Sequence, residues 1–258
     1  IRIESDGRAF DLRPSPQLVR TGRAHVMQQL EYRLRRGENR ITGTIVLYHG
    51  FGANADDLFS LADSLDPERR WNVFCPQAPV PLRYGSEIFG YAWFPETARE
   101  LQDAMSGRYF QNLPELEPDG LETGVRIVLE LVDALELETT RFVAGGFSQG
   151  AMMGVETALQ YRVDALLVYS GALVAQQRLQ DLSEQLRDVP VLQSHGASDS
   201  ILSPDSAHAL RKALSDAGAR VRYYEFQGDH TIPFEIIERS RVFLHTQFSA
   251  SGSGATDL

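Results

Sequence analysis

Short apolar segments alternate with amphipathic ones along almost the whole chain, and this alternation restricts the possible folds. Continuous apolar strands that alternate with helices are typical of a mostly parallel sheet with helices on both faces. The predicted strands are 40–48, 71–75, 141–145, 165–169, 189–195 and 220–226. The predicted helices are 56–66, 120–135, 149–161, 204–217 and 233–248. We therefore expect an α/β fold, whose ligand sites lie at the carboxyl ends of the strands.

One long stretch, 76–119, lacks this pattern and is rich in proline, glycine and aromatic residues. We predict loops and short pieces over the surface there, including the segment YAWF at 91–94, and no large cap domain. The domain boundaries follow from the same pattern. They are an N-terminal extension at 1–30, a main domain at 31–248 and a flexible tail at 249–258.

The composition excludes several classes of protein. The net charge of −10 disfavours nucleic acid as a partner, because phosphate backbones repel an acidic protein. No apolar run is long enough for a transmembrane helix. The Arg-rich extension lacks the apolar core of a signal peptide, so we expect a cytoplasmic protein. Cys75 is the only cysteine, which rules out an intrachain disulfide and a cysteine metal cluster.

The clearest chemical motif is G-x-S-x-G at 146–150, which by itself has little specificity. Its context is informative, because a predicted strand precedes it and a predicted helix follows it. A strand–turn–helix of this kind holds a nucleophilic serine on a strained turn, and glycines flank it because side chains would clash there. The motif predicts Ser148 as nucleophile, with Gly146 and Gly150 shaping the elbow. The alternative is a glycine-rich turn without chemistry.

A serine nucleophile needs a base, and six histidines are available. His25 precedes the domain, and His208 and His245 fall inside predicted helices. His195 ends a strand directly before a glycine, where we expect it to support the backbone. His230 follows the last predicted strand in a loop, as an accessible base should, and is the predicted base.

The base needs an acidic partner, for which Asp199 and Asp229 are the candidates. Asp199 follows the penultimate predicted strand. Asp229 is adjacent to His230, and neighbouring side chains diverge, so Asp199 is the predicted orienter. Ser148, Asp199 and His230 then occur in the chain order Ser, Asp, His that is typical of α/β-hydrolases.

An oxyanion intermediate needs two preorganised N–H donors. The backbone N–H of Gln149, directly after the nucleophile, is one predicted donor. The second should come from a loop after an early strand, and the glycine-rich segment HGFG at 49–52 supplies Phe51. The alternative for that segment is a plain glycine turn, which does not exclude the oxyanion role.

Several segments together resemble the phospholipase/carboxylesterase family of α/β-hydrolases, which includes acyl-protein thioesterases and short bacterial carboxylesterases. The resemblance spans about residues 41–245 in the family's order. It is carried by LYHGFGANADDL (47–58), CPQAPVPL (75–82), YAWF (91–94), GGFSQGAM (145–152), YSGAL (169–173), HGASDSILSP (195–204) and GDHTIP (228–233). The resemblance implies the α/β-hydrolase fold, and it places the family's triad on Ser148, Asp199 and His230.

The resemblance also implies oxyanion donors at Phe51 and Gln149, and an acyl pocket lined by Trp93, Leu173 and Ile232. By sequence alone, the last three would more often be core residues. The chain departs from the family pattern at positions that affect loop shape and hence substrate range. These are Pro95, Ser200 and Ser203.

The expected function is a serine carboxylesterase that hydrolyses small esters with short to medium acyl chains through an acyl-enzyme. An acyl-protein thioesterase or a lysophospholipase would use the same machinery, and a carbon–carbon or dienelactone-type hydrolase is a further alternative. A non-catalytic binding protein on this fold remains the alternative from another class. No metal or cofactor motif is present, so none is expected. The sequence does not indicate an oligomeric state.

Overall fold

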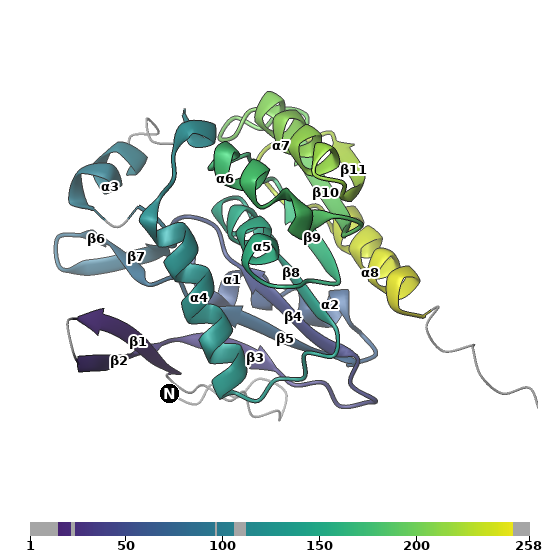
Figure 1. Cartoon of the computed structure of the whole chain (residues 1–258), viewed down its shortest axis with the longest axis horizontal. Coiled ribbons are helices and arrows are strands. Elements are labelled where there is room, and N and C mark those ends of the chain that lie inside the picture. The colour runs from purple at the N-terminus through teal and green to yellow at the C-terminus, as the bar shows by residue number, and fades with distance from the viewer. Residues whose placement is uncertain (1–14, 22–23, 96, 106–111, 250–258) are drawn as a thin grey trace, which may run out of the picture.

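A twisted, mostly parallel sheet forms the centre of the molecule (Figure 1). The computed structural model describes residues 15–21, 24–95, 97–105 and 112–249. The seven strands of the central sheet run in the order β11-β10-β9-β8-β4-β5-β3, and within this sheet only the β3–β5 pair is antiparallel. The strands are β3 (Tyr32–Arg35), β4 (Gly43–Tyr48), β5 (Trp71–Pro76), β8 (Phe142–Phe147), β9 (Ala165–Tyr169), β10 (Pro190–Gly196) and β11 (Arg220–Phe226).

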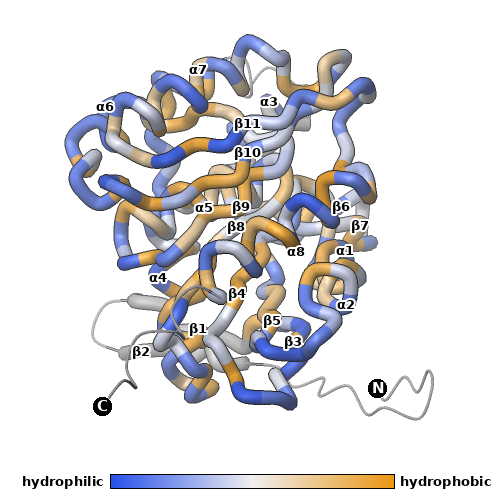
Figure 2. Tube along the Cα trace, turned by 90° about the vertical axis from the view of Figure 1, so that its right-hand side faces the viewer, coloured by the Kyte–Doolittle hydropathy of each residue, from blue (hydrophilic) through white to orange (hydrophobic). Residues whose placement is uncertain are grey.

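Helices cover both faces of the sheet, as the alternation predicts. On β4, Val46 and Tyr48 belong to one buried cluster, whereas Ile45 and Leu47 belong to the other, because successive side chains point to opposite faces. The tube is accordingly orange along the central strands and largely blue on the outer parts of the helices (Figure 2). One face is covered by α4 (Asp119–Ala134), α5 (Gln149–Gln160), α6 (Gln176–Asp181) and α7 (Pro204–Asp216). The other is covered by α1 (Ala55–Phe59), α2 (Ala62–Leu65) and α8 (Phe234–Ser249).

The predicted fold class and the order of its elements are confirmed, with small shifts of the boundaries. The helix predicted at 56–66 is instead two short helices, α1 and α2. The Leu61 N–H bonds to the carbonyl of Leu58, three residues back, and the Ser60 hydroxyl donates to the Asp57 carbonyl at 2.8 Å. These local bonds replace the regular helical ladder between the two helices.

The prediction for 76–119 was wrong in part. A two-stranded hairpin forms there, made of β6 (Val80–Tyr84) and β7 (Glu87–Ala92), followed by α3 (Ala98–Met105) and a short 3-10 helix (Leu113–Glu115). Trp93 and Phe94 are completely buried, not at the surface. The hairpin escaped prediction because a bulge after Leu82 breaks its register and its tip is exposed, so no two-residue apolar alternation marks it.

The predicted N-terminal extension contains a further hairpin, β1 (Ser15–Thr21) paired with β2 (Ala24–Leu30), and β1 lies beside α4 (Figure 1). Its first 14 residues and nearly all of the predicted tail, 250–258, lie outside the described residues. Within the described part of the chain, no helix combines the length and the apolar character needed to cross a membrane.

The strand order brings two distant loops together. β4 lies between β5 and β8 in the sheet. After β4 the chain adds β5 on one side and then β8 to β11 on the other, so the strand order reverses at β4. In such sheets the crevice at the carboxyl ends of the two strands is the usual ligand site. Tyr48 pairs with Gly146, so the loops after β4 and β8 start side by side. β10 and β11 are also parallel neighbours and end together.

Candidate active site

Ser148 occupies a strained turn between β8 and α5. Its φ of 56° and ψ of −118° lie in a region that residues with a side chain rarely adopt. The Ser148 N–H donates to the Tyr169 carbonyl at 2.8 Å, which ties the turn to the next strand. Strain of this kind persists only where the surroundings hold it, and it is concentrated at functional sites.

Both flanking glycines are required by the close approach of the backbone. A Cβ added to Gly150 would lie 1.8 Å from the Tyr48 carbonyl oxygen, and one on Gly146 would lie 2.3 Å from the same atom. Neither contact is possible for a real side chain, so the turn could not form with alanine at either place. The G-x-S-x-G motif therefore forms the strand–turn–helix that the sequence predicts.

The loop after β4 lies against this turn. A Cβ on Gly50 would be 3.4 Å from the Cβ of Ser148. The loop is held by β7, because the Gly52 N–H donates to the Tyr91 carbonyl and the Tyr91 N–H donates to the Ala53 carbonyl, each at 2.9 Å. Gln149 opens α5 directly after the serine, and Phe51, in the loop after β4, lines the same cavity as Ser148. Their role as oxyanion donors stays a prediction.

His49 is a buried structural histidine at the base of the same loop. Its Nδ1 donates to the Gly50 carbonyl at 2.8 Å, and its Nε2 accepts the Ala78 N–H at 3.0 Å. Nε2 must therefore be unprotonated. Burial lowers the pKa of His49 to about 4, which keeps the ring neutral near pH 7.

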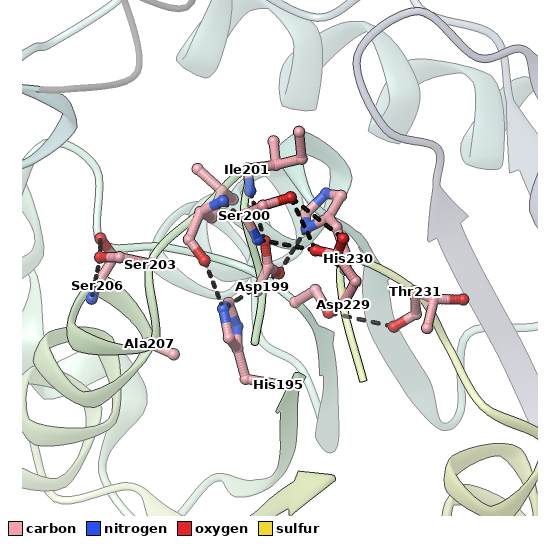
Figure 3. Close-up of polar contacts among 12 residues, drawn as sticks. His195, Asp199, Ser200, Ile201, Ser203, Ser206, Ala207, Asp229, His230 and Thr231 are labelled. Atoms are coloured by element: carbon pink, nitrogen blue, oxygen red, sulfur yellow. Dashed lines mark hydrogen bonds and ion pairs between the residues drawn. The ribbon is translucent and has the colours of Figure 1, made fainter. Parts of the chain in front are cut away.

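Asp199 and His230 are hydrogen-bonded, although 31 positions separate them in the chain (Figure 3). His230 Nδ1 lies 2.6 Å from Asp199 Oδ2. The other oxygen, Oδ1, accepts the backbone N–H groups of Ile201 and Leu202, each at 2.9 Å. The Asp199 side chain is completely buried. These bonds fix the carboxylate, so it can hold the imidazole in one tautomer with Nε2 free for chemistry.

Asp229, the alternative orienter, does not hold the ring of His230. Its carboxylate accepts the backbone N–H groups of His230 and Ser200 instead, each at 2.8 Å. His195, predicted to support the backbone, is buried, and its Nε2 donates to the Leu202 carbonyl at 2.9 Å.

Ser148 and His230 line one cavity of about 430 Å³. The ring of Phe147 packs beside the His230 ring, with centroids 4.7 Å apart. Within the described residues, no hydrogen bond joins the Ser148 hydroxyl to His230, and such bonds often tighten only when substrate binds. The remaining lining residues are Gly50, Phe51, Gly52, Ala53, Asp57, Met152, Ile201 and Leu202.

The residues suggested for an acyl pocket are not in this cavity. Trp93 is fully buried and packs edge-on against Tyr48, with centroids 5.1 Å apart. Leu173 lines a separate hollow between α6 and α7, and Ile232 packs on the core beneath the other face. Their acyl-binding role stays a prediction.

Sequence reasoning missed the apolar residues that do line the cavity, including Met152, Ile201 and Leu202. Met152 is one helical turn after Ser148, so its spacing could have identified it. Ile201 and Leu202 come from the loop after the predicted acid, whose backbone path no sequence pattern shows.

The Gln149 side chain, which the sequence reasoning did not consider, connects the elbow to the segment after β7. Its Oε1 accepts the Trp93 N–H at 2.9 Å, and its Nε2 donates to the Phe94 carbonyl. The Trp93 indole N–H donates to the His49 carbonyl at 2.9 Å. These bonds satisfy the polar groups of a segment that is otherwise buried among apolar residues.

Within the described residues, no group of three or more His, Cys, Asp or Glu side chains is arranged to hold a metal ion. The arrangement at the carboxyl ends of the strands comprises a strained serine, a histidine in the same cavity and a buried carboxylate bonded to that histidine. This set of groups suits nucleophilic acyl transfer.

Comparisons with known proteins agree with the fold and the chemistry. A family model described as Phospholipase/Carboxylesterase matches residues 32–248. Acyl-protein thioesterase 1 of Eremothecium gossypii is 24% identical over 218 residues, which cover 80% of this chain and 88% of the relative. Its namesake from Schizosaccharomyces pombe is 26% identical over 206 residues, which cover 75% of this chain and 86% of the relative.

Solved structures give the same picture. Esterase PE8 superposes with a TM-score of 0.66 at 26% identity, covering 84% of this chain and 98% of that chain. Acyl-protein thioesterase 2 of Zea mays superposes with a TM-score of 0.66 at 20% identity, with the same coverage, and at that identity shows the fold alone.

Proposed function

The chain belongs to the phospholipase/carboxylesterase family of serine hydrolases, and we propose that it hydrolyses short- to medium-chain carboxylic esters through an acyl-enzyme. The observation that carries the proposal is the bond between Asp199 and His230, with His230 and the strained Ser148 lining one cavity. A buried carboxylate, a histidine and a serine in this arrangement can activate the hydroxyl as a nucleophile.

In the proposed reaction, Ser148 Oγ attacks the ester carbonyl while His230 Nε2 takes its proton. His230 then gives that proton to the leaving alcohol, and the carbonyl re-forms as an acyl-serine. A water molecule attacks this ester with His230 as base, which releases the acid and restores Ser148. Asp199 holds the imidazole and stabilises its cation during both halves.

The tetrahedral intermediates carry a negative oxygen, for which the N–H groups of Phe51 and Gln149 are the proposed donors. Donors fixed in place before the reaction stabilise this charge without reorganisation. The main-chain bonds between Gly52, Ala53 and Tyr91 and the side-chain bonds of Gln149 to the Trp93–Phe94 segment fix the surroundings of these donors.

The cavity supports the choice of substrate. About 430 Å³ is near the lower end of the range for small-molecule sites, which favours small esters over a long acyl chain. Its lining is mostly apolar, as an acyl group requires.

The cytoplasmic location stays a prediction.

The second candidate is an acyl-protein thioesterase, for which the names of the fungal relatives are the specific support. The same serine, histidine and carboxylate would cleave a thioester. The two functions differ in the length of the acyl chain and in the leaving group.

Hydrolysis of p-nitrophenyl esters from C2 to C12 tests the proposal, with Ser148→Ala as the comparison and a medium-chain acyl thioester as the second substrate. We expect turnover that is highest for short or medium chains and falls to background in Ser148→Ala. An optimum at the longest chains together with faster thioester cleavage would favour the thioesterase. Wild-type protein that neither turns over these esters nor is labelled by a serine-directed phosphonate would exclude both.

A further inference from the structure

Two loops carry the proposed acid and base, and a second bridge joins them beside the Asp199–His230 bond. Asp199 and Ser200 come from the loop after β10, and Asp229 and His230 come from the loop after β11. Asp199 bonds to His230, and Ser200 bonds to Asp229 (Figure 3). Each residue of one consecutive pair thus bonds to a residue of the other.

The Ser200–Asp229 bridge has several contacts. Asp229 Oδ1 accepts the Ser200 N–H at 2.8 Å, and the Ser200 hydroxyl lies 3.0 Å from Oδ1 and 3.2 Å from Oδ2. Oδ1 also accepts the N–H of His230 at 2.8 Å. One carboxylate oxygen therefore holds the backbone directly after the proposed acid and the backbone of the proposed base.

The charge of Asp229 and the close approach of the two loops strengthen the bridge. The N–H groups of Ser200 and His230 hold the pKa of Asp229 below its ordinary value, so it is ionised near pH 7 and accepts strong bonds. A Cβ on Gly196 would lie 2.4 Å from the Asp229 carbonyl oxygen, so the two loops approach as closely as a glycine allows. Further main-chain bonds join Ala197 to Phe226 and Ser198 to Gly228.

We propose that Asp229 is a positioning residue, which acts through Ser200 and the His230 backbone to keep the Asp199–His230 bond formed before substrate binds. This inference rests on the proposed function of the same site. Asp229 does not line the cavity, so it has no contact through which to bind the acyl group. Its loss should therefore lower kcat and leave KM nearly unchanged, because the bond it preserves acts in the chemical steps.

Three variants and a control separate the contributions. Asp229→Ala removes the bridge, Asp229→Asn keeps an acceptor oxygen without the charge, and Ser200→Ala removes only the hydroxyl. Asp216→Asn is the control, because Asp216 is an exposed carboxylate paired with Lys212 on α7. We expect kcat for a p-nitrophenyl ester to fall about ten-fold in Asp229→Ala, with KM within about two-fold of wild type. Asp229→Asn should recover part of that loss.

The double variant tests whether the two residues act through one bridge. Ser200→Ala should lower kcat in the wild-type background and have no further effect in Asp229→Ala, since residues that share a contact are not additive. Unchanged kcat in Asp229→Ala, independent effects in the double variant, or a loss expressed mainly in KM would each overturn the inference. An inactive wild-type protein would instead count against the proposed function. Thermal unfolding of each variant checks that the fold is intact.

Discussion

His195 Nε2 lies 3.3 Å from Asp199 Oδ2, the same carboxylate oxygen that meets His230. Both side chains are completely buried. Nε2 carries the proton, because it donates to the Leu202 carbonyl, and burial lowers the pKa of His195, which keeps the ring neutral. The proposed acid thus lies between the base and a second, neutral histidine, whose N–H bonds to the Leu202 carbonyl.

We expect His195→Leu to destabilise the protein and slow the reaction, because it leaves the Leu202 carbonyl buried without its partner. The loss of one such bond costs about 1–3 kcal/mol. His195→Gln, whose amide nitrogen reaches a similar place, should recover much of the loss. Urea unfolding followed by kcat measurements on the two variants tests this, and equal stability of wild type and His195→Leu would contradict it.

Gln149→Ala should lower the free energy of unfolding by about 2–4 kcal/mol, because it removes the acceptor of the Trp93 N–H and a donor to the Phe94 carbonyl in a buried segment. Gln149→Glu provides the matched comparison, since it keeps an acceptor for Trp93 but places a carboxylate beside the Phe94 oxygen. Both variants retain the backbone N–H at 149. Denaturant titration gives the difference, and a loss below about 0.5 kcal/mol would show that the side-chain bonds carry little stability.

Acid should destabilise the fold through His49. The folded pKa of about 4 lies below the ordinary histidine value of 6.5, so the unfolded chain binds this proton first as the pH falls. The stabilisation is fully present above pH 6.5 and is lost as the pH falls toward 4, by roughly 3 kcal/mol in total. His49→Gln removes the titrating group. The unfolding free energy of the wild type should therefore fall more steeply between pH 7 and 4.5 than that of the variant, and parallel curves would refute this.

Asp57 should influence which substrates enter the cavity. It lines the cavity and has neither an ion pair nor a side-chain hydrogen bond among the residues that the structure describes. Asp57 is exposed at the surface, but the protein atoms around its carboxyl displace part of the surrounding water, and this desolvation raises the pKa of the carboxyl. A nearby negative charge favours a cationic substrate over a neutral one of the same shape.

Butyrylcholine and 3,3-dimethylbutyl butyrate form a suitable pair, because they share their shape and differ in charge. We expect Asp57→Asn to reduce the preference for the choline ester about two- to five-fold in kcat/KM at low salt. Added salt should reduce the preference in wild type and have less effect in the variant. A preference that does not depend on residue 57 would show that this carboxylate is too far from the bound ester to matter.

The elements that the sequence could predict are those in which local pattern and burial agree. β9 and β11 match their predicted limits, 165–169 and 220–226, because each is a short strand bounded by turn residues. The β6–β7 hairpin could not be predicted, since an exposed hairpin has no apolar alternation. The burial of Trp93 could not be predicted either, because its N–H groups find their partners at Gln149 and His49, which are far away in the chain.

In the candidate site, too, the sequence predicted what depends on local pattern and missed what depends on contacts between distant loops. Ser148, Asp199 and His230 could be selected from their places after predicted strands, and the structure brings Asp199 and His230 into contact. The contact between Ser200 and Asp229 could not be anticipated, because it depends on how two loops cross. The same holds for the apolar lining of the cavity, which comes from separate loops and one helix.

β7 pairs with the loop after β4 through main-chain groups of Gly52, Ala53 and Tyr91. This pairing constrains one position of the hairpin, because a Cβ on Gly90 would lie 2.0 Å from the Gly52 carbonyl oxygen. The exposed tip of the hairpin, at Tyr84 and Phe89, can by contrast change its sequence while the loop after β4 keeps its position. Variation of this tip, natural or engineered, would therefore alter the surface of the hairpin without moving the loop that carries the proposed oxyanion donor Phe51.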